Sequence, residues 1–378
     1  MPNKATSNHQ WAVGLMTGTV LDGNIDVALI HSDGIVIDHF GAWQLSTYPP
    51  EVRRMIARAL AQARAWSFKD LPPPSFALAQ DALTRAQAEA VNTLIAEAGL
   101  TAKDIDIIGF HGQTIKHQAP TKGQQGRTLQ LADGPLMAHL TGIDVAFDFR
   151  SNDMSNGGQG APLAACFHAA LLSQAKIPTP CAVLNLGGVG NITWFGGGDA
   201  LYAFDTGPAN APINDWVARH TDAVMDTGGA LAAQGHVDQQ RLESWLAHPY
   251  FASPPPKSLD RFDFSATLAE GLSLVDGAAS LTALCVAAVA HGLDHLPHKP
   301  CEIIVSGGGR KNPVMMAMLA EWTGVTVRPA EAVHWSGDAI EAQCFAYLAR
   351  RVRKGLPISF PATTGVPRPL IGGRIAWA

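Results

Sequence analysis

One plan of secondary structure occurs twice in this sequence, and that repetition limits the possible folds more than any other feature. Each half begins with short apolar runs separated by turn residues, and helical patterns alternating with further apolar runs follow. The opening runs are Trp11–Met16, Ile25–Ile30 and Ile35–Phe40 in the first half, and Ala182–Leu186, Ile192–Phe195 and Leu201–Phe204 in the second. We therefore expect an α/β fold in which a three-stranded antiparallel meander followed by helices and strands is used twice. No repeat of short fixed period accompanies it, so a duplicated domain is expected and a solenoid is not.

The later patterns fill in the same plan in both halves. In the first half we expect helices at 51–65, 75–98 and 162–173 and strands at 105–110, 129–132 and 145–149. In the second half we expect helices at 276–291, 313–322 and 338–351 and strands at 302–305 and 325–327.

The length of 378 residues corresponds to about 2.5 domains of ordinary size, so two domains are expected. We place an N-terminal lobe at 1–150, a C-terminal lobe at 151–350, and a tail at 351–378 that packs back on the N-terminal lobe. The boundary near residue 150 is chosen because a predicted strand ends there in a polar, glycine-rich stretch. Apolar residues make up 47% of the chain and charged residues 16%, which is a globular composition.

The net charge of −5 argues against binding of nucleic acid or of an anionic membrane surface. We find no apolar stretch that predicts a signal peptide or a membrane span. The five cysteines are scattered and include no Cys-x-x-Cys pair, which argues against disulfides and a structural zinc site. A cytoplasmic protein is therefore expected.

Two glycine-rich turns at equivalent positions are the first candidate for a binding site. Residues 16–23 (Met-Thr-Gly-Thr-Val-Leu-Asp-Gly) and 186–191 (Leu-Gly-Gly-Val-Gly-Asn) each join the first two strands of a half. Glycine lets backbone N–H groups approach a polyanion, and Thr17, Thr19 and Asn191 add side-chain donors. Either turn alone is more simply a tight hairpin. Their equivalent positions favour a pair of turns that binds a triphosphate.

Asp205 is the candidate general base. It follows an apolar strand and precedes Thr-Gly-Pro, whose restricted backbone would hold the carboxylate in place. The alternative is a turn or helix cap, which we favour for Asp26.

Three other segments follow predicted strands. His111, Gln113 and Thr114 offer donors and acceptors suited to a polyhydroxylated ligand, whereas a lone His is more often structural. Arg150 could bind an anionic group or form a structural ion pair. Gly307 and Gly308 offer bare backbone for a flat group such as adenine, with a glycine hinge as the alternative.

Motifs of other enzyme classes do not occur in the sequence. It contains no Gly-x-x-x-x-Gly-Lys-Ser/Thr loop, no Gly-x-Ser-x-Gly elbow, and no Gly-x-Gly-x-x-Gly opening a helix after the first strand. A P-loop enzyme, an α/β-hydrolase and a dinucleotide dehydrogenase are therefore disfavoured.

Eight short sequence motifs, in the same order along the chain, resemble those of the anhydro-N-acetylmuramic acid kinase family of the actin, Hsp70 and sugar-kinase superfamily. They lie at 14–23, 111–114, 148–150, 157–163, 185–192, 204–210, 255–258 and 306–309 and span almost the whole chain. The resemblance implies two RNase H-like lobes with an ATP-binding cleft between them. It implies a cytoplasmic enzyme of cell-wall sugar recycling that opens 1,6-anhydro-N-acetylmuramic acid with water and phosphorylates O6.

The resemblance also implies roles for particular residues. Asp205 would be the catalytic base, and Mg²⁺ would be carried by the ATP phosphates, with no metal site assigned on the protein. Sugar-binding residues would be His111, Gln113, Arg150 and Glu341. ATP would be bound by Gly18, Thr19, Val20, Leu21, Asp22, Gly187, Gly188, Asn191, Gly307 and Gly308. A homodimer is expected from the family.

The sequence departs from the family pattern at two places near the first turn. Val20 stands where a Ser is usual, which removes a hydroxyl near phosphate, and Asn24 is an extra residue. Two alternatives stay open at this point. They are a kinase of the same superfamily that acts on another sugar, and an actin- or Hsp70-like ATPase that switches conformation for a protein partner.

Overall fold

The computed structural model describes residues 9–17, 23–121 and 123–378. These residues form two compact units. Unit 1 contains the described residues up to Gln174 together with Ala339–Pro361 and Val366–Ala378, and unit 2 contains Ala175–Asp338 and Ala362–Gly365.

Unit 1 is built on a six-stranded sheet of order β13-β7-β4-β1-β2-β3. The first three strands form an antiparallel meander, whereas β4 and β7 run parallel to β1. A two-stranded hairpin, β5–β6, lies apart from this sheet. The strand bounds are β1 Gln10–Met16, β2 Asn24–Ser32, β3 Ile37–Thr47, β4 Ile105–Phe110, β5 Gln113–Gln118, β6 Arg127–Leu131, β7 Val145–Phe147 and β13 Arg374–Ala376.

Unit 2 is built on a five-stranded sheet of order β10-β9-β8-β11-β12. Strands β8, β9 and β10 form the antiparallel meander, and β11 and β12 run parallel to β8. The bounds are β8 Cys181–Leu186, β9 Val189–Gly197, β10 Ala200–Pro208, β11 Glu302–Ser306 and β12 Thr326–Pro329. Strand order and direction therefore match β3-β2-β1-β4-β7 of unit 1, which confirms the predicted α/β fold with a duplicated three-stranded unit.

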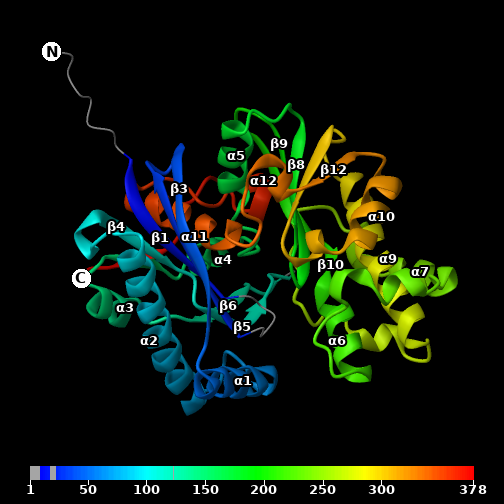
Figure 1. The fold of residues 1–378 in the computed structure, drawn as a ribbon, viewed down its shortest axis with the longest axis horizontal. Helices are drawn as coiled ribbons and strands as arrows, with labels where there is room; N and C mark the ends of the chain where they lie inside the picture. The colour runs from blue at the N-terminus through cyan, green and yellow to red at the C-terminus, as the bar shows by residue number, and fades with distance from the viewer. Residues whose placement is uncertain (1–8, 18–22, 122) are drawn as a thin grey trace. The chain divides into compact units, whose positions relative to one another are not determined.

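Helices follow the strands in each half of the chain (Figure 1). Those of the first half are α1 Pro50–Ala65, α2 Pro74–Glu97, α3 Gly134–Thr141, α4 Ser151–Ser155 and α5 Ala165–Gln174. Those of the second half are α6 Asn210–His220, α7 Gln239–Leu246, α8 Pro249–Ala252, α9 Leu274–Leu293, α10 Pro313–Thr323, α11 Ile340–Arg353 and α12 Pro361–Thr364. Short 3₁₀ helices lie at Ala102–Asp104, Thr227–Gly229, Ala232–Gln234, Ala266–Ala269, Gly308–Lys311 and Ala330–Val333.

Helix α11 belongs to unit 1, so the expected C-terminal lobe of 151–350 is wrong at its end. The helix packs on β1, β2 and β4, where Gly14 and Gly109 allow close approach. A Cβ added at Gly14 would lie 1.8 Å from the Ala342 carbonyl oxygen, and one at Gly109 would lie 2.0 Å from that of Phe345. The predicted helix at 338–351 is real, but the bare backbone of these two strands places it.

The expected boundary near residue 150 also differs from the structure, since unit 1 continues to Gln174 through α4 and α5. Helix α5 packs against α11 and β3, both in unit 1. At the end of the chain, β13 pairs antiparallel with β7 of unit 1.

Each unit has its own apolar core. In unit 1, Val13 and Leu15 of β1 pack with Leu83 and Val91 of α2, while Gly14 between them faces α11. In unit 2, α9 is the central helix and packs between α6, α7 and α10. Helix α9 is the one described helix long and apolar enough to cross a membrane, but 72% of that window is buried inside the protein. It is therefore the core helix of unit 2.

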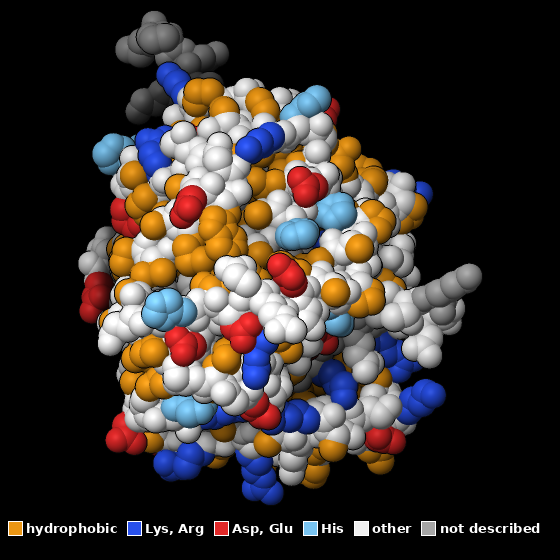
Figure 2. Space-filling model, turned by 90° about the vertical axis from the view of Figure 1, so that its right-hand side faces the viewer, with side chains coloured by type: hydrophobic (Ala, Val, Ile, Leu, Met, Phe, Trp, Pro, Cys, Tyr) orange, Lys and Arg blue, Asp and Glu red, His pale blue; other side chains and the backbone are white. Residues whose placement is uncertain are grey.

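All five cysteines are free, and only Cys301 is exposed. Figure 2 shows acidic and basic side chains scattered over one face with hydrophobic side chains between them.

Candidate active site

Asp205 lies near the end of β10, the edge strand of the unit 2 sheet, and is 6% exposed. Its backbone N–H donates to the Lys257 carbonyl at 3.1 Å, and its carbonyl accepts from the Tyr250 hydroxyl at 2.5 Å. The N–H of Leu259 donates to its carboxylate oxygen Oδ2 at 2.9 Å. The outer edge of β10 is therefore covered at Asp205 by the chain from Tyr250 to Leu259, and the carboxylate is held by main chain.

Polar residues line up across four adjacent strands beside Asp205. Asp205 on β10 is in register with Asn191 on β9, Asn191 with Asn185 on β8, and Asn185 with Ser306 on β11. Residues paired in this way project from the same face of a sheet. The row therefore connects the predicted base, the predicted phosphate residue Asn191 and the start of the Gly307–Gly308 turn.

The turn between β8 and β9 is docked on the N-terminus of α6. The Gly187 carbonyl accepts from Asn210 N–H at 2.9 Å, and the Gly188 carbonyl accepts from Ala209 N–H at 3.1 Å and from Ala211 N–H at 3.2 Å. These bonds satisfy N–H groups that the first turn of a helix leaves unpaired. Within the described chain, the N–H groups of Gly187 and Gly188 themselves donate no hydrogen bond. Two donors are therefore open at this turn.

Gly307 and Gly308 lie against the same turn. Gly307 has φ +74°, and a Cβ there would be 2.6 Å from the Leu186 carbonyl, so only glycine fits. Arg310 anchors the loop, since it donates to the Gly307 carbonyl at 2.9 Å and pairs with Glu331 at 2.8 Å and Asp338 at 2.9 Å. Sequence reasoning missed this role of Arg310, because its acidic partners are distant in the chain.

In unit 1, His111 and Arg150 form a hydrogen-bonded pair. Nε and Nη2 of Arg150 lie 3.2 and 3.1 Å from Nε2 of His111, and Nη1 donates to the Gly160 carbonyl at 2.7 Å. Arginine cannot accept a hydrogen bond, so Nε2 accepts and Nδ1 carries the proton that goes to the Gly112 carbonyl at 2.7 Å. Burial, with the Arg150 charge second, lowers the pKa of His111 to about 3.

Gln113 and Glu341 lie in the same unit as this pair. Gln113 is 1% exposed, its amide donates to the Thr114 carbonyl, and its Oε1 has no partner in the described chain. Glu341 is in the first turn of α11, one turn before Phe345, whose ring centroid is 4.6 Å from that of His111. Burial raises the pKa of Cys344 on this helix, and the charges of Glu341 and Arg150 both act on it.

Several candidate residues cannot be placed, and one has a different environment from that expected. Gly18, Thr19, Val20, Leu21 and Asp22 lie outside the described residues. Thr17, expected to donate to phosphate, is 4% exposed, and its hydroxyl is engaged by Tyr48 at 2.9 Å and by the Gln87 amide at 2.6 Å.

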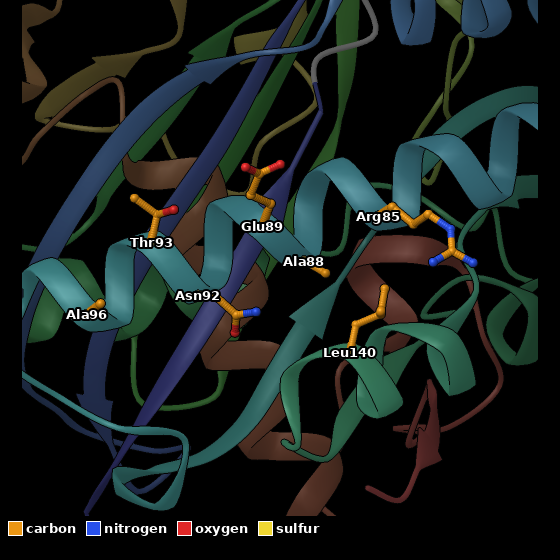
Figure 3. Close-up of a pocket in the computed structure, with 7 residues that line it drawn as sticks. All are labelled: Arg85, Ala88, Glu89, Asn92, Thr93, Ala96 and Leu140. Carbon is orange, nitrogen blue, oxygen red and sulfur yellow. The ribbon is translucent and has the colours of Figure 1, made fainter.

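A surface groove of unit 1 contains none of the predicted site residues. It has a volume of about 520 Å³ and is lined by residues of α2, from Arg85 to Ala96, and by Leu140 of α3 (Figure 3). No group of three or more His, Cys, Asp or Glu side chains in the described ranges is arranged to hold a metal ion.

Comparison with known proteins identifies the family of the chain. The family model for anhydro-N-acetylmuramic acid kinase matches residues 10–378. The chain is 57% identical to the anhydro-N-acetylmuramic acid kinase of Brucella anthropi over 97% of its own length and 98% of the relative. It is also 57% identical to that of Mesorhizobium japonicum over 97% and 99%. The chain therefore belongs to the anhydro-N-acetylmuramic acid kinase family.

Proposed function

We propose that this protein converts 1,6-anhydro-N-acetylmuramic acid, ATP and water to N-acetylmuramic acid 6-phosphate and ADP, in the recycling of cell-wall sugars. Water forms the new C1–O bond, the C1–O6 bond breaks, and O6 forms a bond to the γ-phosphorus as the bond to the ADP oxygen breaks. The proton lost by water goes to a carboxylate. The family match over residues 10–378 is the observation that carries this proposal.

Asp205 is the proposed acceptor of that proton. Its backbone is held on both sides by Tyr250 and Lys257, and Leu259 fixes one carboxylate oxygen, so the group is oriented before substrate arrives. A general base needs this restricted geometry, whereas a helix cap does not: helix α6 begins five residues later and has no side-chain cap at Ala209.

In unit 2, the proposed triphosphate contacts are the open N–H groups of Gly187 and Gly188 and the side chain of Asn191. The family resemblance separately assigns Gly18–Asp22, which lie outside the described residues, to ATP binding. Gly307 and Gly308 would lie against the adenosine. Mg²⁺ prefers phosphate oxygens with few protein ligands, and the donor set of the polar row, with one carboxylate, fits that preference. When bound, the ion would neutralise phosphate charge.

The proposed sugar residues are Arg150, Gln113 and Glu341. Arg150 would bind the carboxylate of the sugar's lactyl group, and the open Oε1 of Gln113 would accept from a hydroxyl or amide. Both ring nitrogens of His111 are already engaged, so His111 would act by orienting Arg150.

The reaction is tested by measuring ADP release from Mg·ATP with and without the anhydro-sugar, in ¹⁸O-labelled water. We expect strong stimulation and a product that is heavier by one phosphate and one labelled water. A phosphorylated product without solvent oxygen would indicate direct transfer to a free hydroxyl, which is the chemistry of a sugar kinase without the hydrolytic step. ATP turnover that no sugar stimulates would favour an ATPase switch.

Replacement of Asp205 tests the base. Asp205→Asn keeps the shape and the acceptor for Leu259 N–H but cannot take a proton, so kcat should fall by ~10²–10⁴ with ATP affinity nearly unchanged. Single-turnover rates and calorimetric ATP-analogue binding measure the two effects. Turnover within a fewfold of wild type would remove Asp205 from this role.

A cytoplasmic location and a homodimer complete the proposal, on family resemblance. Cell fractionation and light scattering of the purified chain test them.

A further inference from the structure

The Pro255–Ser258 motif contains a buried lysine that has no role in the proposed reaction. Lys257 is 7% exposed, and its Nζ donates to the Tyr250 carbonyl at 2.9 Å. The same Nζ lies 4.6 Å from the centroid of the Tyr250 ring and 5.9 Å from that of Phe204. Burial of an ammonium group costs free energy unless it is paired, and here its partners are one carbonyl and two aromatic rings.

Lys257 and Tyr250 both connect to the residue proposed as the base. The Tyr250 hydroxyl donates to the Asp205 carbonyl, and the Lys257 carbonyl accepts from the Asp205 N–H. Lys257 Nζ in turn donates to the Tyr250 carbonyl and lies against the Tyr250 ring. The contacts form a closed loop that runs from Asp205 to Tyr250, to Lys257 and back to Asp205.

Because Asp205 lies on an edge strand, its outward backbone groups need partners from outside the sheet. On an edge strand, every second residue turns its N–H and carbonyl away from the sheet, and those of Asp205 bond to Lys257 and Tyr250. Immediately after Asp205 the register of β10 shifts against β9, so the ladder is interrupted where the carboxylate must be held. The outer contacts therefore supply the rigidity that a central strand would receive from two neighbours.

We propose that Lys257 and Tyr250 are positioning residues that hold Asp205 in its reactive geometry through this loop of contacts. The proposal rests on the proposed role of Asp205 as base. Neither residue touches the reacting atoms, so removal of either should affect kcat and leave KM for both substrates nearly unchanged.

The charge of Lys257 should be visible in the pH profile. Burial lowers the pKa of Lys257 to about 8, and burial with the charges of Asp205 and Asp263 raises the pKa of Tyr250, so Tyr250 stays a donor. The titratable groups around the lysine are Asp205 on β10, Tyr250 on α8 and His295 after α9, which contacts the Phe204 ring and the Phe251 carbonyl. As pH rises through about 8, Lys257 loses its charge and its attraction to the Tyr250 ring, and kcat should fall.

The test measures kcat, both KM values and the pH profile of full-length Lys257→Met and Tyr250→Phe. Each should lower kcat by about 10- to 100-fold with KM within about threefold, because a small displacement of a catalytic group costs that much. Lys257→Met should also lose the fall in kcat above about pH 8, and Lys257→Arg should keep kcat at higher pH. Lys299→Met, an exposed lysine of the same unit, is the control and should match wild type.

Wild-type kcat and an unchanged alkaline limb in Lys257→Met would overturn the proposal, as would an effect on KM instead of kcat. If Lys257→Met does not bind an ATP analogue and is misfolded, Tyr250→Phe decides, since it removes one hydroxyl only. Loss of turnover in Asp205→Asn with normal Tyr250→Phe and Lys257→Met would refute the positioning role alone. Full activity of Asp205→Asn would refute the proposed base.

Discussion

Two buried histidines of unit 1, His111 and His168, and the partly buried His117 make the stability of the protein sensitive to acid. Burial lowers the pKa of His111 and His168 to about 3 and that of His117 to about 4. The unfolded chain binds protons near pH 6.5, so between pH 6.5 and about 4 it binds more protons than the folded chain. Stability is therefore fully present above pH 6.5 and is lost as pH falls below it.

We expect the free energy of unfolding to fall by roughly 2 kcal/mol for each of these three histidines between pH 7 and pH 5. Urea titrations at the two pH values measure this, and His168→Gln should remove about one third of the histidine contribution. The control is His236→Gln, because the His236 side chain is 98% exposed. A free energy of unfolding that is the same at both pH values would contradict the burial of neutral histidines.

At the residue scale, the prediction of Asp205 as the base rests on a local signal, a strand followed by Thr-Gly-Pro, and the structure describes this carboxylate as buried and held by main chain. The pairing of His111 with Arg150 had no such signal, since 39 residues separate the two side chains. The sequence therefore predicted that both residues are polar groups near strand ends, but it left the tautomer of His111 and the contacts of Arg150 undetermined.

At the scale of elements, α11 is held by its close approach to two strands. We expect Gly109→Ala to destabilise the protein by about 3 kcal/mol or more, because its Cβ would lie 2.0 Å from the Phe345 carbonyl oxygen and the backbone must move. Gly99→Ala is the control, since nothing lies within 4 Å of a Cβ there and only the cost of φ +71°, about 1–2 kcal/mol, is expected. Equal losses in denaturant titrations would mean that α11 does not pack as closely as described.

The existence of α11 was predictable, but its partners were not. Its helical pattern is local, whereas the glycines that accept it lie in β1 and β4, more than 200 residues earlier in the sequence. In a single sequence, Gly14 and Gly109 are indistinguishable from glycines of turns. The prediction from the sequence therefore assigned this helix to the C-terminal lobe, together with the segments that precede it in the chain.

At the scale of the whole molecule, a buried arginine on α11 joins this late segment of the chain to the first strands of unit 1. Arg350 is fully buried, donates to the Ser32 carbonyl at 3.0 Å and to Gln10 Oε1 at 3.1 Å, and pairs with Asp106. Removing one partner of a buried pair typically costs about 3–5 kcal/mol. Asp106 would keep Arg353 at 3.6 Å, but the Ser32 carbonyl and Gln10 Oε1 would each lose a donor. Arg350→Met should therefore weaken unit 1 in particular.

Hydrogen exchange in the full chain should resolve this effect. We expect faster exchange of β1, β4 and α11 in Arg350→Met, with exchange of α9 unchanged, because the two units have separate cores. Lys354→Met, at an exposed position just after the helix, should behave as wild type. An equal increase in α9 would show that the units unfold as one.

By itself, the sequence determined the duplicated plan of strands and helices, the glycine-rich turn between β8 and β9, and the family. These features depend on hydrophobic period, turn chemistry and short words, all of which are local properties of a chain. Only the tertiary structure decided that α11 joins unit 1, that Thr17 is engaged inside unit 1, and that Tyr250 and Lys257 enclose Asp205. Each of these depends on contacts between segments distant in the sequence, and their geometry is set by packing rather than by the residues of either segment alone.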